Sequence, residues 1–182
     1  MTMLSQNLLD LSDFAWQRLQ TRMEGLTDDE YFWEPFADCW NVFKTADGSF
    51  QADRSESPPD PPPFTTLAWR ITHITIDVLQ AERTATWFGL QSSPADGPPP
   101  VPGSATEAVR ALDNAYTIWR RRLSMLSQVD LDRPMGIVAG PYADSDGTSF
   151  ALHILDELIH HGAEVGVIRD IYRGRQDPVF TL

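Results

Sequence analysis

The chain of 182 residues has little cysteine and no long apolar run. Cys39 is the only cysteine, which excludes an internal disulfide and a thiolate-rich metal site within one chain, and we assign it no role. No stretch approaches the roughly 20 apolar residues that a membrane span needs, and the N-terminus lacks the basic segment of a signal peptide. We therefore expect a cytoplasmic protein that does not associate with membranes.

Basic residues are also few, 14 against 26 acidic ones, which gives a net charge of −12. This charge repels phosphate backbones, and the basic residues form only one dense cluster, Arg120 to Arg122. A nucleic-acid partner is therefore not expected. The residues that are present, 42% hydrophobic and 22% charged, have the composition of a globular protein, and the length fits a single domain over residues 1–182.

Apolar spacing and capping signals predict four long helices. The first covers residues 4–24, where apolar side chains recur at intervals of three and four. The second covers residues 65–89, from a threonine that can cap a helix to a glycine that can end one, and its two apolar stripes place it centrally. The third covers residues 105–126, after a capping box formed by Ser104 and Glu107, and the fourth covers residues 149–173.

The connections between these helices are irregular and rich in proline. Thr27 and Glu30 predict a capping box for a short helical turn, which a long non-helical segment over residues 36–63 follows. The connector over residues 91–103 contains five prolines and is just long enough to cross the length of the bundle. Both an up-and-down bundle and a bundle with one crossover are therefore open.

The fourth predicted helix concentrates residues that bind metals. His153, Glu157 and His161 follow one another at steps of four, which places their side chains within an arc of about 80°, whereas His160 points about 100° away from His161. A metal needs a further ligand from elsewhere. His73 is the only histidine outside this helix, and it supplies that ligand if the second and fourth helices are antiparallel neighbours.

Two imidazoles and one carboxylate match catalytic zinc with an open coordination position, and they also match non-haem iron. Each residue alone has a simpler interpretation, a surface helix pair for Glu157 and His161 and a hydrogen-bonded core histidine for His73. Their coincidence favours a metal site, because all four histidines of the chain lie on two helices that each have an apolar face.

The pattern His153-x3-Glu157-x2-His160-His161, together with His73 at the end of the segment TTLAWRITH, resembles the DinB-like superfamily. This family includes thiol-dependent maleylpyruvate isomerases and mycothiol and bacillithiol transferases. The resemblance implies an all-α four-helix bundle with an up-down-down-up path, a long first loop and a crossover between the second and third helices. It also implies His73, Glu157 and His161 as ligands of a divalent metal.

Glu157 departs from the family pattern, because many members have histidine there, but the mycothiol-dependent maleylpyruvate isomerase type has glutamate. The resemblance therefore implies a thiol-dependent S-transferase or isomerase, with a low-molecular-weight thiol such as mycothiol as cosubstrate and a small electrophile as substrate. Zinc is the expected ion, with nickel or iron as alternatives. The resemblance also implies a homodimer.

Further residues are candidates for the surroundings of the metal. His153, His160, Arg70 and Trp69 are expected around the ligands or in the pocket, with Arg70 able to steer an anionic thiol or carboxylate. Aromatic residues of the long first loop are expected to wall the pocket: Trp33, Trp40 and Phe43.

Two other functions remain open. The first is a non-catalytic metal- or ligand-binding protein, which a fourth protein ligand from His153 would favour. The second is a metal-dependent hydrolase, which needs a carboxylate base near the metal, and Asp77 and Asp156 are the candidates for it.

Overall fold

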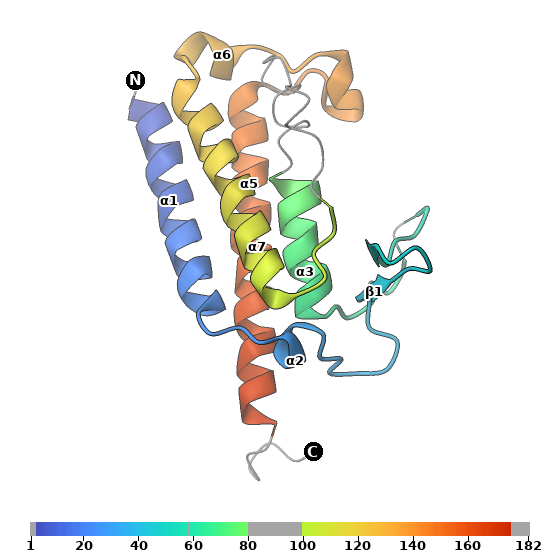
Figure 1. The fold of residues 1–182 in the computed structure, drawn as a ribbon. Coiled ribbons are helices and arrows are strands. Elements are labelled where there is room, and N and C mark those ends of the chain that lie inside the picture. The colour runs from blue at the N-terminus through green and yellow to red at the C-terminus, as the bar shows by residue number, and fades with distance from the viewer. Residues whose placement is uncertain (1–2, 58, 80–99, 176–182) are drawn as a thin grey trace.

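The computed structural model describes residues 3–57, 59–79 and 100–175 (Figure 1). Its long helices are α1 (Met3–Met23), α3 (Leu67–His73, continued by the π-helical turn η1, Ile74–Val78), α5 (Ala105–Met125) and α7 (Gly147–Gly174). Short elements connect them: α2 (Asp28–Tyr31), β1 (Val42–Lys44), β2 (Phe50–Ala52), α6 (Gln128–Asp132) and the 3₁₀ helix η3 (Ile137–Tyr142). The predicted all-α class and its four main helices are confirmed.

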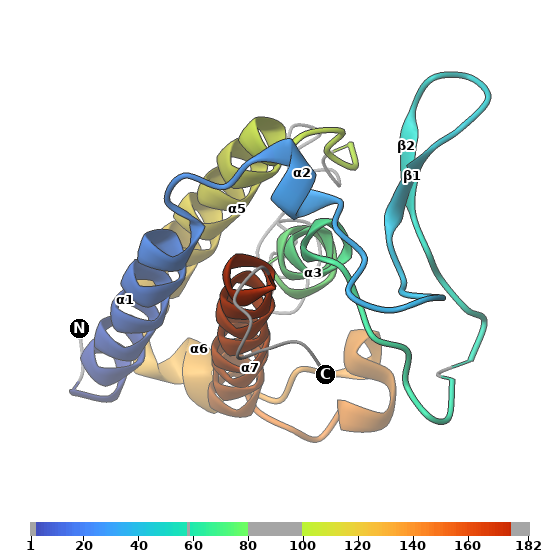
Figure 2. The ribbon, with the colours of Figure 1, turned by 90° about the horizontal axis from the view of Figure 1, so that it is seen from below.

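The four main helices pack side by side, as two perpendicular views show (Figures 1 and 2). Side-chain hydrogen bonds join Asp13 to Arg120 and Gln20 to Asp113, so α1 and α5 are antiparallel. Helices α3 and α7 are also antiparallel, whereas α1 and α7 run in the same direction (Figure 1). The chain thus follows an up-down-down-up path, and most of the connection from α3 to α5 lies outside the described residues.

The helix ends follow the predicted capping chemistry in part. Ser104 caps α5 by accepting the Glu107 N–H, but the Glu107 carboxylate accepts from the Gly103 N–H, so the predicted capping box is incomplete. The cap of α3 is Thr66 and not Thr65, because the Thr66 hydroxyl accepts the Trp69 N–H while Thr65 pairs with Trp40 in an isolated bridge. Asp146 caps α7, which therefore begins at Gly147, two residues before the predicted start. The predicted continuation of the second helix from residue 80 to Gly89 lies outside the described residues.

The long first loop contains a β-hairpin that was not predicted from the sequence. Strands β1 and β2 are antiparallel, with Phe43 opposite Gln51, and Gly48 in the turn has a φ of +87°. The loop is anchored at the start of α3, where the Thr66 N–H donates to the Trp40 carbonyl and the Trp40 N–H donates to the Phe64 carbonyl. These hydrogen bonds hold Trp40, just before strand β1, next to the first turn of α3.

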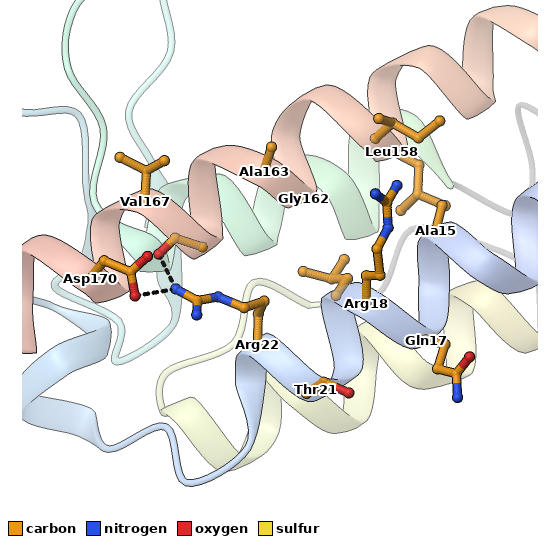
Figure 3. Close-up of a pocket in the computed structure, with 13 residues that line it drawn as sticks. Ala15, Gln17, Arg18, Thr21, Arg22, Leu158, Gly162, Ala163, Val167 and Asp170 are labelled. Carbon is orange, nitrogen blue, oxygen red and sulfur yellow. Dashed lines mark hydrogen bonds and ion pairs between the residues drawn. The ribbon is translucent and has the colours of Figure 1, made fainter.

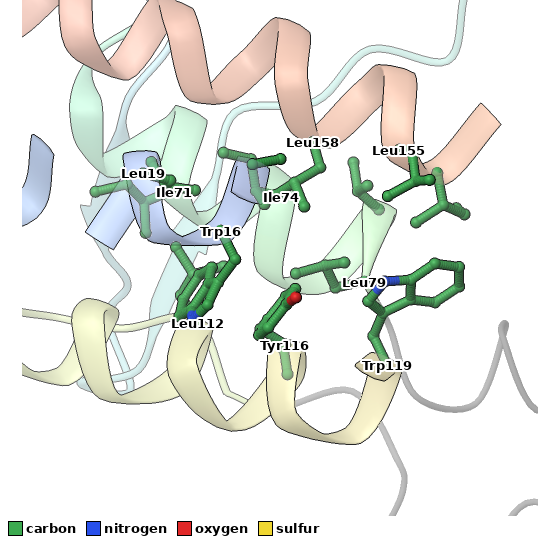
Figure 4. Packing of buried hydrophobic residues seen from close by; sticks show 14 of the residues in the cluster. Trp16, Leu19, Ile71, Ile74, Leu79, Leu112, Tyr116, Trp119, Leu155 and Leu158 are labelled. Atoms are coloured by element: carbon green, nitrogen blue, oxygen red, sulfur yellow. The ribbon is translucent and has the colours of Figure 1, made fainter. Parts of the chain in front are cut away.

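A single cluster of buried apolar side chains joins the four long helices (Figure 4). Trp16 of α1 stacks on Tyr116 of α5 with ring centroids 4.4 Å apart. The indole N–H of fully buried Trp119 donates to the Ser12 hydroxyl, which also bonds the Tyr116 hydroxyl, so these buried polar atoms are satisfied. Close packing of this kind fixes the rotation of each helix about its axis, and with it the direction of the polar side chains.

A buried ion pair ties the short helix α2 to the C-terminal half of α7. The Arg169 guanidinium donates two hydrogen bonds to the Glu30 carboxylate, at 2.7 and 2.8 Å, and further bonds to the carbonyls of Arg22 and Glu24. The Glu30 carboxylate therefore serves Arg169, and Thr27 alone caps α2 by accepting the Glu30 N–H. Figure 3 shows a related contact, in which Arg22 of α1 donates to the Gly166 carbonyl and to Asp170.

Candidate metal centre

Two helices position the three predicted ligands. His73 is the last residue of the α-helical part of α3, and Glu157 and His161 lie one turn apart on α7. Fully buried Ile71 and Ile74 anchor α3 on either side of His73. Because α3 and α7 are antiparallel neighbours, the ligands from both helices lie at the same level of the bundle.

The structure brings the three side chains together. One ligand atom from each of His73, Glu157 and His161 lies within 4.8 Å of the other two. The Glu157 Oε2 atom is 3.1 Å from His161 Nε2 and 3.9 Å from His73 Nε2, and the two imidazole centroids are 4.7 Å apart. The His161 side chain is nearly buried, whereas those of His73 and Glu157 are partly exposed, so the cluster lies at the edge of the core.

These distances fit a small divalent ion. Ligand atoms placed about 2.0–2.1 Å from a tetrahedral ion lie roughly 3.3 Å from one another. The separations of 3.1 and 3.9 Å between the Glu157 oxygen and the two imidazole nitrogens lie on either side of that value. Small rotations of the side chains therefore suffice to bring all three atoms into coordination range.

A carboxylate behind His73 prepares it for metal binding. The His73 Nδ1 atom is 3.0 Å from Asp77 Oδ2, and the Asp77 carboxylate also accepts hydrogen bonds from Arg54. An ionised carboxylate can only accept, so Nδ1 carries the proton and Nε2 presents its lone pair toward Glu157. Burial raises the pKa of Asp77, but the hydrogen bonds and charges of His73 and Arg54 outweigh it, and the net pKa is lowered.

Glu164 plays the same part behind His161. Its Oε2 atom is 2.7 Å from His161 Nδ1, which therefore donates, and His161 Nε2 lies at hydrogen-bond distance, 3.1 Å, from Glu157 Oε2. Arg70 lies beside this pair, with its Nε atom 2.9 Å from Glu164. Burial raises the pKa of Glu164, but the hydrogen bond from His161 and the charge of Arg70 together outweigh it, so the net pKa is lowered and the carboxylate remains ionised at neutral pH.

The donor set suits a cation. Both Nδ1 atoms donate to their carboxylate partners, so the two Nε2 atoms are the ring nitrogens that face Glu157. Three acceptors at this distance repel one another unless a cation or a proton lies between them. The residues present therefore fit a divalent metal, with outer partners of the kind that metal-bound histidines have in proteins.

The π-helical turn η1 directly follows His73 and contains Asp77. The helical hydrogen bonds change there to a spacing of five, as in the bond from the Leu79 N–H to the Ile74 carbonyl, and the Thr75 hydroxyl donates to the Ile71 carbonyl. π-Turns inside helices are frequent at functional sites. In this chain the π-helical turn lies directly after His73 and carries Asp77, the hydrogen-bond partner of His73.

Aromatic side chains connect the first loop to the cluster. Trp69 stacks on the His73 ring at a centroid distance of 5.0 Å and donates its indole N–H to the Asp53 carbonyl. Trp40 lies 5.4 Å from Trp69. Trp69 therefore lies against His73, and Trp40 of the loop packs against Trp69.

Other predicted pocket residues lie elsewhere. Trp33 packs edge-on against Tyr172 near the end of α7, and the half-exposed Phe43 lies on strand β1.

Cys39 is a buried thiol that donates to the Phe36 carbonyl. Burial raises the pKa of this thiol, which does not favour a reactive thiolate.

The two remaining histidines of α7 are exposed. His153 lies one turn before Glu157 and belongs to neither of the two metal-ligand clusters that the described residues form. His160 lies with its Nε2 atom 3.5 Å from Glu164 Oε1, in a second cluster with His161 and Glu164. His160 thus lies on the Glu164 side of His161, away from Glu157.

The roles of Asp77 and Glu164 behind the ligands were not predicted. Both have a signal in the sequence, because Asp77 follows His73 by four residues and Glu164 follows His161 by three, which are the spacings of neighbours on a helix. Arg54 has no such signal, because it comes from the loop.

Within the described residues, no helix is both long and apolar enough to cross a membrane.

Comparison with known families gives one match, the model of the DinB superfamily, over residues 12–165. The matched range includes the three clustered residues and both carboxylates behind them. No curated protein and no solved structure gives a significant match to the chain.

Proposed function

The chain belongs to the DinB superfamily of metal-binding proteins, and on that premise we propose that it is a metal-dependent, thiol-dependent S-transferase or isomerase. His73, Glu157 and His161 hold the divalent ion, for which zinc is the first choice and nickel or iron the alternatives. The cosubstrate is a low-molecular-weight thiol of the mycothiol type, and the substrate is a small electrophile.

One observation carries this proposal. Two imidazoles, each backed by a carboxylate, and one further carboxylate converge at one point, and the described residues add no fourth protein ligand there. Three protein ligands leave a coordination position for a small molecule, as in catalytic zinc sites. A bound divalent ion supplies Lewis-acid chemistry, which lowers the pKa of a thiol or water at that position.

The chain's own residues prepare the site for an anion. Asp77 and Glu164 accept hydrogen bonds from the Nδ1–H groups of His73 and His161. Both imidazole rings are therefore oriented before any ligand arrives. Arg70 and Arg54 balance the charges of Glu164 and Asp77, respectively. With a divalent cation and the charge of Glu157, the site has a net charge of about +1, which favours a thiolate over a neutral thiol.

The proposed reaction conserves atoms and electrons. The thiol loses its S–H proton to solvent, and a sulfur lone pair forms a bond to the electrophilic carbon of the substrate. In a transfer, the leaving group departs with the electron pair of the bond that breaks. In an isomerisation, sulfur adds to a carbon–carbon double bond, the resulting single bond rotates, and sulfur leaves again as thiolate.

The two alternatives receive less support. A closed structural site needs a fourth ligand such as His153, whose side chain is exposed and outside the cluster. A hydrolase needs a free carboxylate base, but Asp77 is engaged by His73 and Arg54, and Asp156 is exposed on α7.

An assay with zinc-loaded protein, purified thiol and a chromogenic electrophile tests the proposal. We expect product formation that depends on the thiol, is lost in His161→Ala, and is retained in His153→Ala, which removes an exposed histidine from the same helix. Zinc-loaded protein that shows no thiol dependence with a panel of electrophiles would remove the transferase and isomerase proposal.

A further inference from the structure

A half-open cavity of about 390 Å³ lies on the far side of His161 from the metal-ligand cluster. Its walls come from the segment before α3 and from one face of α7, and most of them are apolar: Pro63, Phe64, Ile159, Ala163, Val167 and Ile168. Ala163 and Val167 also line a groove between α7 and α1 (Figure 3). These two residues therefore separate the cavity from that groove. The volume lies within the range of small-molecule sites.

Four polar residues line this cavity. One is Thr65, and the other three surround the Nδ1 edge of His161: Arg70, His160 and Glu164. The Arg70 side chain is only 13% exposed. Its guanidinium lies over the Trp69 ring at 5.0 Å, so one of its faces is covered by an aromatic surface. The cavity therefore combines apolar walls with a cation that is largely removed from water and with the carboxylate of Glu164 beside it.

The N–H donors of the buried Arg70 guanidinium are incompletely hydrogen-bonded. Its Nε atom is close to Glu164, but the geometry makes an ion pair and not a hydrogen bond, and Nε has no hydrogen-bond partner. Its Nη1 atom is 3.0 Å from His161 Nδ1, which already donates its proton to Glu164 and so cannot accept another.

We propose that this cavity binds a small organic carboxylate with an apolar body, and that Arg70 is its counter-ion. The guanidinium supplies the planar, forked donors that match a carboxylate, and its Nε atom has no hydrogen-bond partner among the described residues. The apolar walls take the hydrocarbon part of the ligand. A neutral analogue of the same shape gains only the apolar contacts and should bind much more weakly.

Occupancy of the cavity should strengthen metal binding, a coupling that rests on the proposed metal site. A carboxylate that pairs with Arg70 frees Glu164 to accept more fully from His161 Nδ1, which makes Nε2 a better ligand. It also adds negative charge near the ion. Coupling is reciprocal, so metal binding must raise the affinity for the carboxylate by the same factor.

Isothermal titration of benzoate into the apo-protein and the zinc-loaded protein tests this proposal, with benzamide as the neutral probe. We expect benzoate to bind both forms, to bind the zinc-loaded form about fivefold more tightly, and benzamide to bind at least tenfold more weakly than benzoate. Arg70→Gln should lose benzoate binding, whereas Arg121→Gln, which removes the same charge from an exposed position on α5, should not.

A second pair of variants keeps the test valid if Arg70→Gln does not fold. Val167→Phe places a larger side chain at a half-exposed position in the cavity wall and should weaken benzoate binding, whereas Leu152→Phe at an exposed position of α7 outside the cavity should not. Equal binding of benzoate and benzamide, or no benzoate binding by the wild-type apo-protein, would overturn the proposal. Failure of zinc to bind would refute the metal centre, while the apo-protein titrations would still decide the carboxylate site.

Discussion

The carboxylate behind His73 gives the most informative single substitution, Asp77→Asn. The amide keeps the size of the side chain and an oxygen that can accept from His73 Nδ1, but it removes the charge that fixes the imidazole proton and that pairs with Arg54. None of the proposed metal ligands is altered. We expect the variant to fold and to bind zinc more weakly than the wild type.

The magnitude follows from the hydrogen bond. A bond to a charged acceptor contributes about 1.5–3 kcal/mol and a neutral one about 0.5–1.5 kcal/mol, so the substitution costs roughly 1–1.5 kcal/mol. That difference is about a tenfold change in the dissociation constant. It lies at the lower end of the range of about 10–100-fold for partners of metal-bound histidines, in keeping with the partial exposure of both side chains.

Competition with a fluorescent zinc chelator at pH 7 measures this change. Asp144→Asn is the matched control, because it removes one negative charge from an exposed aspartate in the loop before α7. The control should bind zinc as the wild type does. If Asp77→Asn and Asp144→Asn bind zinc with the same affinity, Asp77 does not prepare His73, and the assignment of the Nδ1 proton is wrong.

Three further predictions concern the scaffold. Glu30→Ala leaves the Arg169 guanidinium buried without its carboxylate, and the loss of about 3–5 kcal/mol should lower the Tm by about 6–20 °C; a change under 3 °C by circular dichroism would contradict a buried pair. Thr66→Ala removes the cap that accepts the Trp69 N–H and should cost about 1 kcal/mol, seen as a lower midpoint in urea unfolding, whereas an unchanged midpoint would refute the cap. Hydrogen bonds from the Thr45 and Ser49 hydroxyls lower the pKa of Asp47 to about 2. This lowered pKa stabilises the fold above about pH 4, and the contribution is lost as the pH falls through about 2. Carbon-detected NMR titration of Asp47 should give that low midpoint, and a midpoint near 4 would contradict the turn geometry.

The helices and the pairing of Glu157 with His161 were predictable because both depend on local spacing. Residues four apart on a helix share a face, so Glu157 and His161 were predicted together from sequence alone. His73 required one assumption, that two apolar helices pack as antiparallel neighbours, and the structure has that arrangement. The same rule applied to His73 and His161 would also have identified Asp77 and Glu164.

Other features depend on contacts between distant segments and have weaker signals. The hairpin has a local one, since Asp47-Gly48 lies between two short apolar and aromatic stretches, but strands of three residues are too short for a clear alternation. The pairing of Glu30 with Arg169 joins residues 139 positions apart, and Glu30 had been assigned to a capping box. The approach of Arg54 to Asp77 likewise follows from the docking of the loop.

Metal content of protein produced without a histidine tag tests the central claim most directly. After dialysis against zinc and removal of loosely bound ions, elemental analysis should find one zinc ion per chain in the wild type and in His153→Ala, and much less in His73→Ala and His161→Ala. Equal zinc content in all four proteins, or none in the wild type, would contradict a metal centre formed by His73, Glu157 and His161.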